Sequence, residues 1–100
     1  MTLRDVLEGV ADELEVDSEI SGDSIEWRRG DRAFAVATGD DAAEFDLDPA
    51  VARAAARTPD VQPSPRGDGW VVFRPALLDD HAADRAEAWF SSAWRLAGHS

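Results

Sequence analysis

The segment IEWRRGDRAFAVAT, residues 25–38, decides the fold that this sequence predicts. Ile25 and Trp27 alternate with charged residues, a pattern that is typical of a half-buried strand. Residues 29–31 have the composition of a tight turn, and residues 32–38 continue as a second strand with small or apolar side chains on both faces. A strand with two apolar faces favours a central position, so this hairpin predicts the middle of an antiparallel sheet.

The segments on either side of this hairpin supply helices and further strands. Thr2 and Asp5 resemble a capping box before a helix, and the pair Asp48-Pro49 marks the start of another. The expected elements outside the hairpin are a helix over residues 3–14, a loop over 15–24, a strand over 43–47, a helix over 49–57, an edge segment over 60–65, a strand over 70–73 and a helix over 81–97. The prediction is therefore a single α+β domain over residues 1–100, in the order α-β-β-β-α-(β)-β-α, whose antiparallel sheet is covered by helices.

Composition limits the class of protein and its environment. The 100 residues contain no cysteine, which excludes disulfides, thiolate catalysis and cysteine-ligated zinc. The start of the chain turns acidic at once, unlike a secretory signal, and no apolar run approaches the roughly 20 residues that span a bilayer. A cytoplasmic location is the resulting expectation.

The net charge is −11, because 21 acidic residues face only ten basic ones, all of them arginine. One interpretation is a halophilic or high-GC source, in which acidic side chains keep the surface hydrated. The other is a surface that attracts a cationic partner. Both interpretations argue against binding to nucleic acid or to a membrane surface, since those targets are held by clustered cations.

The halophilic interpretation predicts that stability rises with salt. The Debye length falls from about 10 Å at 0.1 M salt to about 3 Å at 1 M salt, so added salt screens the repulsion between carboxylates. We expect the midpoint of thermal unfolding to increase across that range. A midpoint that does not rise would count against this interpretation.

Residue types that carry catalysis or bind metals are scarce. The histidines are His81, in the first turn of the last predicted helix, and His99, next to the C-terminus. His81 with Asp79, Asp80 or Asp84 could hold a hard cation weakly, but acidic residues at a helix N-terminus are explained by the helix dipole, and no activated nucleophile is near. We therefore expect no catalytic residue, no metal and no cofactor.

Arginines and one tryptophan are the candidate binding residues. Three arginines cluster around the hairpin turn, and two more stand one helical turn apart in the helix predicted over residues 49–57. Arginine binds carboxylate and phosphate through its two-pronged guanidinium, so the five would form an anion site if that helix lies near the hairpin. A tryptophan at the margin of the last helix's apolar stripe is expected at the surface. The candidate residues are Arg28, Arg29, Arg32, Arg53, Arg57 and Trp94.

Short stretches spread along most of the chain point to a known family. They are TLRDVL at residues 2–7, DRAFA at 31–35, FDLDP at 45–49, DVQPS at 60–64 and GWVVF at 69–73, followed by a closing helix over 88–96. In this order they resemble the MmcQ/YjbR family of small bacterial proteins. The resemblance implies a double-wing or CyaY-like α+β fold and a proposed role in DNA binding, and it implies no catalytic residues. The stretch GWV is also similar to a second family, the small domain described as luciferase-like.

The charge of this chain departs from the MmcQ/YjbR pattern. Where family members commonly carry lysine, it has Arg32, Asp46 and Asp48. We therefore expect a non-enzymatic binding or protein-interaction domain, as a monomer or weak homodimer, with a protein or a small molecule as its partner. The alternative is nucleic-acid or anion binding through the hairpin that carries Arg28, Arg29 and Arg32.

Overall fold

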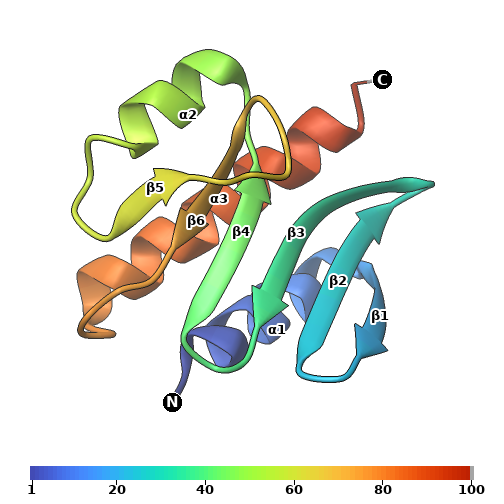
Figure 1. The fold of residues 1–100 in the computed structure, drawn as a ribbon. Coiled ribbons are helices and arrows are strands. Elements are labelled where there is room, and N and C mark those ends of the chain that lie inside the picture. The colour runs from blue at the N-terminus through green and yellow to red at the C-terminus, as the bar shows by residue number, and fades with distance from the viewer. Residues whose placement is uncertain (100) are drawn as a thin grey trace.

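The computed structural model describes residues 1–99 and contains, in that range, three helices and one six-stranded sheet. The elements in chain order are α1 (Leu3–Leu14), β1 (Asp17–Ser21), β2 (Ser24–Arg29), β3 (Arg32–Thr38), β4 (Ala42–Asp46), α2 (Pro49–Ala55), β5 (Val61–Pro63), β6 (Trp70–Phe73) and α3 (Asp80–Ala97). The strands lie in the order β1-β2-β3-β4-β6-β5, and all neighbouring pairs are antiparallel. The α+β class, the antiparallel sheet and the helical cover predicted from the sequence are confirmed (Figure 1).

The hydrophobic core lies between the sheet and the two helices α1 and α3, which run behind the strands in Figure 1. No helix crosses the front of the sheet in that view, and we call this side the open face. Phe90 of α3 is fully buried. The centroid of its ring lies 5.3 Å from that of Trp27 and 5.1 Å from that of Phe34, and both contacts are T-shaped. Such aromatic pairs contribute beyond the area that they bury, so Phe90 fastens the central hairpin to α3.

A β-bulge changes the side-chain pattern of β3. Regular alternation would place Phe34 on the same face as Val36, but the register between β2 and β3 shifts next to Trp27 and leaves Phe34 unpaired. The extra residue turns the Phe34 side chain towards Phe90 on the helix side, while Val36 remains on the open face. The bulge therefore explains how one strand supplies large side chains to both faces.

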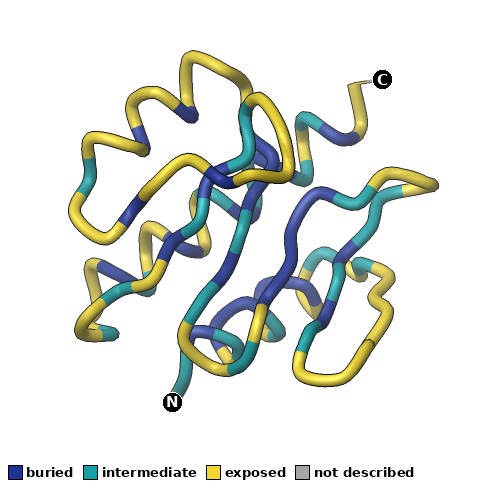
Figure 2. The backbone as a smooth tube through the Cα atoms, viewed as in Figure 1, coloured by how far each residue is buried: buried dark blue, intermediate teal, exposed yellow. Residues whose placement is uncertain are grey.

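The sequence predicted one edge of the sheet correctly and missed the strand at the other edge. The edge segment predicted over residues 60–65 is confirmed, because β5 pairs with β6 alone. The loop predicted over residues 15–24 is wrong, because β1 pairs with β2 along its whole length. All five β1 residues are exposed, as Figure 2 shows, so the strand lacks the apolar alternation by which sequence patterns reveal strands.

Capping residues lie at the starts of all three helices, within one residue of the starts that the sequence predicted. The Thr2 hydroxyl accepts a hydrogen bond from the Asp5 backbone N–H at 3.1 Å, and the Thr2 N–H donates to the Asp5 carboxylate at 3.0 Å. The hydrogen bond that the Thr2 backbone N–H donates to the carboxylate, and then the Thr2 side chain, favour the ionised form and lower the pKa of Asp5. Asp48 and Asp79 cap α2 and α3 by accepting from backbone N–H groups in their first turns.

Candidate binding site

Arg28 lies on the open face and forms ion pairs with two carboxylates. Its Nη2 atom is 3.2 Å from Glu26 on the same strand and 3.4 Å from Glu19 on β1. The hydrogen bond with Glu26, and then the charges of Glu26 and Glu19, raise the pKa of Arg28. One guanidinium therefore offsets two neighbouring acids, as expected of an arginine that balances its surroundings.

Arg29 follows Arg28 directly but reaches the helix side of the sheet. Its Nη1 donates to the Trp94 carbonyl at 2.9 Å, and its guanidinium carbon lies 3.9 Å from the centroid of the Trp94 ring. This position is the C-terminal end of α3, where the helix dipole favours a cation. Gly98 leaves the space that Arg29 needs, because a Cβ there would lie 2.5 Å from the guanidinium carbon. Arg29 and Trp94, both candidate binding residues, are thus partners of each other and join β2 to α3.

The remaining arginines do not gather around the hairpin. Arg32 donates to Asp46 on β4 at 2.9 Å. Arg53 and Arg57 belong to α2 and the turn after it, and α2 packs beside β6, away from the tip of the β2–β3 hairpin (Figure 1). The five arginines are therefore spread over separate partners and regions, and the condition for a shared anion site is not met.

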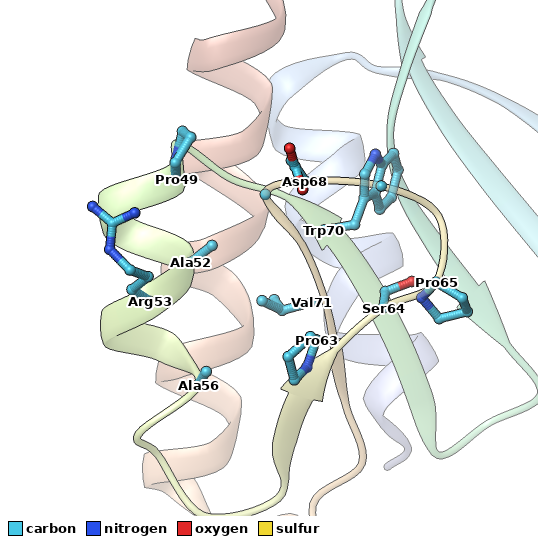
Figure 3. A pocket seen from close by; sticks show the side chains of 12 residues that line it. Pro49, Ala52, Arg53, Ala56, Pro63, Ser64, Pro65, Asp68, Trp70 and Val71 are labelled. Carbon is cyan, nitrogen blue, oxygen red and sulfur yellow. The ribbon is translucent and has the colours of Figure 1, made fainter.

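A concave site does exist on the other half of the sheet. A pocket of about 630 Å³ opens between α2 and the segment that runs from β5 into β6 (Figure 3). Its apolar walls come from Ala52, Ala56, Pro63, Trp70 and Val71. We call it the Trp70 pocket. Its volume lies within the range of about 300–1,000 Å³ that is typical of sites for small ligands or projecting side chains.

Two opposite charges stand at the rim of the Trp70 pocket. Arg53 of α2 and Asp68 of the loop both belong to the pocket lining, and in Figure 3 the Arg53 side chain extends from the outer side of α2, away from Asp68. Neither side chain forms an ion pair or a hydrogen bond with another group in residues 1–99. The pocket therefore offers one cation and one anion that are available to a ligand, of which only Arg53 was a candidate from the sequence.

A small polar network fixes the loop that forms one wall of the pocket. The Ser64 hydroxyl donates to Glu44 on β4 and accepts from the Arg66 backbone N–H. The Arg66 side chain donates from Nε to the same carboxylate at 2.8 Å, and its guanidinium carbon lies 5.6 Å from the Trp70 ring centroid. Glu44 thereby holds the loop against the open face and keeps Arg66 beside Trp70.

Gly69 lets the same loop return into β6. Its φ is +87°, and a Cβ at this position would lie 2.4 Å from the carbonyl oxygen of Leu47. The Leu47 N–H also donates to the Gly69 carbonyl at 2.9 Å, so the two backbones are in direct contact. Only glycine fits this approach without displacement, and it sets the position of the adjacent Trp70.

The sequence singled out Trp94 as a candidate binding residue and did not single out Trp70, which lines the pocket. Both tryptophans are half-buried, but Trp94 is covered by Arg29 while Trp70 lines a cavity. A usable signal was present in the two prolines at positions 63 and 65 and the glycines at 67 and 69, which form an irregular, surface-exposed wall directly before a strand. Recognising that wall as part of a pocket needs the position of α2, which no local pattern supplies.

Within residues 1–99, no three side chains of the metal-binding types come together in a candidate site, and no helix has the length and apolarity that a membrane crossing demands.

Comparison with known proteins supports the fold. No family model matches the chain, and no similar curated protein was found, so the resemblances to the MmcQ/YjbR and luciferase-like families stay predictions. Among solved structures, the chain is similar to the crystal structure of a protein from Pseudomonas syringae, with a TM-score of 0.70 over 97% of this chain and 99% of that chain. The two sequences are 11% identical, and the likeness therefore shows the fold alone.

Proposed function

We propose that this chain is a non-enzymatic protein-interaction domain, and that its Trp70 pocket receives an apolar side chain from a cationic partner. The observation that carries the proposal is the pocket itself, in which the half-buried Trp70 and the exposed Pro63 present apolar surface within a concavity of suitable size. Energetically dominant contacts in protein interfaces are commonly aromatic or aliphatic side chains seated in pockets of this kind.

Charge supports a cationic partner. The chain carries a net charge of −11, which accelerates the approach of positively charged molecules and opposes that of anions. At the pocket rim, Asp68 is free to meet a positive group beside the apolar anchor. Arg53 would then face a carbonyl or solvent, and its charge is not required for affinity.

Nucleic-acid or anion binding through the hairpin has weaker support. Arg28, Arg29 and Arg32 each donate to an oxygen of the protein itself, so phosphate contacts would have to replace existing bonds. Titration of labelled DNA at low and high salt tests this alternative, because backbone-directed binding strengthens as salt falls. Absence of binding at low salt would exclude it.

The proposed function predicts that small aromatic cations bind in the Trp70 pocket. The probes are L-phenylalaninamide, which is cationic, and N-acetyl-L-phenylalanine, which is anionic. Binding of each probe is monitored in the ¹⁵N–¹H spectrum of the labelled protein. We expect the cation to shift the signals of Ala52, Val71 and the Trp70 indole and to bind more tightly than the anion. Trp70→Ala should weaken its binding by about tenfold or more.

Matched variants separate pocket binding from general attraction. Ala56→Phe places a ring in the pocket and should abolish binding of the cation, whereas Val51→Phe adds the same ring to an exposed position of α2 outside the pocket lining. Asp68→Asn should lower the affinity for the cation by a factor of about two to five, the scale of an exposed ion pair. Equal effects of the two phenylalanine variants, or shifts spread evenly over the acidic surface, would contradict the proposal.

A further inference from the structure

The outer edge of β1 is the second surface that points to a partner. We propose that this edge accepts an extended basic segment of another protein, which adds to the sheet as a further antiparallel or parallel strand. The strand order places β1 at one end of the sheet and β6 and β5 at the other. The inference is therefore independent of the Trp70 pocket.

The backbone of β1 is a regular, open template. The strand pairs with β2 from Asp17 to Ser21 without a register shift, and no other strand in the described part of the chain lies beyond it. It contains neither proline nor glycine, so neither device blunts the edge. Alternate N–H and C=O groups of an edge strand point outward, and they are the groups through which an added strand binds.

The side chains on the open face of β1 select the charge of the added strand. Asp17 and Glu19 lie on this face, and the Glu19 side chain is 68% exposed although it contacts Arg28. Arg28 is shared with Glu26, so one cation serves two carboxylates and negative charge remains in excess. Opposite charges on neighbouring strands stabilise pairing, and a basic side chain on the added strand would meet this row.

The same charges argue against a second copy of this chain as the occupant. Antiparallel pairing of two β1 strands about Glu19 would place the two Glu19 carboxylates directly opposite each other, which is unfavourable. Each chain also carries a net charge of −11, so the approach of two copies is repulsive. Acidic residues on an edge are a known protection against self-association, and here they leave a strand of opposite charge as the acceptable partner.

Ile20 indicates what the other face of the added strand should carry. It pairs with Ile25, which is buried in the core, but Ile20 itself is 66% exposed and belongs to no core cluster. An apolar side chain on the added strand would cover Ile20 and extend the apolar surface from Ile25 outward. The expected segment therefore alternates basic and apolar residues.

The test uses an acetylated and amidated seven-residue peptide in which arginine and valine alternate. The probe is added to the ¹⁵N-labelled protein, and amide shifts and hydrogen exchange are recorded. We expect shifts confined to residues 17–21 and their neighbours on β2, with exchange at alternate β1 amides slowed by about tenfold or more. The absence of such changes at millimolar peptide would overturn the proposal.

Two peptide controls and one charge exchange make the result specific. A peptide N-methylated on the backbone groups that face the strand should not bind, and equal binding would show attraction without strand addition. Asp17→Lys combined with Glu19→Lys should reverse the binding preference, so that the variant binds the glutamate peptide more tightly than the arginine peptide. Should this variant lose its native spectrum, Asp17→Asn with Glu19→Gln replaces it and should abolish the charge preference.

Two further measurements distinguish this site from its alternatives. Concentration-dependent protection of β1 amides without peptide would identify a second copy as the occupant and overturn the proposal. Ala56→Phe, which fills the Trp70 pocket, should leave peptide binding at β1 unchanged. A loss of binding in that variant would show that the peptide occupies the pocket and not the edge.

Discussion

Replacing Phe90 by alanine is expected to lower the free energy of unfolding by about 3–5 kcal/mol, the range for buried aromatic truncations. Phe90 has no exposed surface, and its ring forms T-shaped contacts with Trp27 and Phe34 across the helix–sheet boundary. A domain of this size is stable by about 5–15 kcal/mol in total, so the variant should be close to its unfolding threshold. Urea unfolding followed by circular dichroism measures the change.

A conservative substitution and an exposed truncation complete that experiment. Phe90→Leu keeps most of the apolar volume and should cost clearly less than Phe90→Ala, because the remaining cavity is smaller. Leu77→Ala removes a side chain that is 72% exposed and should change stability by less than about 0.5 kcal/mol. A loss below about 1 kcal/mol for Phe90→Ala would mean that the contacts to the hairpin do not fasten α3.

Gly69→Ala is expected to destabilise the domain by at least about 3 kcal/mol, since the substitution combines backbone strain with steric overlap. The φ of +87° disfavours any side chain, and the new Cβ would overlap the Leu47 carbonyl at 2.4 Å. The strain acts on the residue before Trp70, so aromatic cations should also lose affinity for the pocket. Urea unfolding and the phenylalaninamide titration measure the two effects separately.

Gly22 provides the matched control for Gly69. It also has a positive φ, of +58°, but a Cβ there would meet nothing within 4 Å. Gly22→Ala should therefore cost only the backbone strain, about 1–2 kcal/mol. If the two variants were equally destabilised, the contact between Gly69 and Leu47 would carry none of the effect.

The elements that sequence patterns predicted are those with a local physical cause. The capping pair Thr2 and Asp5 and the caps Asp48 and Asp79 determine helix starts within a few residues, and helical spacing determines the rest. β1 was missed because an exposed edge strand buries neither face and shows no alternation. The bulge at Phe34 was missed because it depends on pairing with β2 and on the position of Phe90.

The candidate site was predictable only in part, and the arginine cluster shows why. Arg28 and Arg29 are neighbours in sequence, but successive residues of a strand point to opposite faces, and these two side chains reach Glu26 and Trp94 on either side of the sheet. Arg53 does line a pocket, but with Trp70, which comes from a different strand. The contact between α2 and β6 that creates this pocket has no signature in either segment alone.

Arg29 and the Trp94 carbonyl that it binds are separated by 65 positions in the chain, and the contacts of Phe90 with the same hairpin also join distant segments. During synthesis, the hairpin is made before α3, and Trp27 and Phe34 then lack the aromatic contacts that Phe90 supplies. The domain can acquire its native core only after α3 has emerged. Molecular chaperones that bind apolar strands would therefore meet the hairpin during this interval, and any truncation before α3 should yield a chain that aggregates.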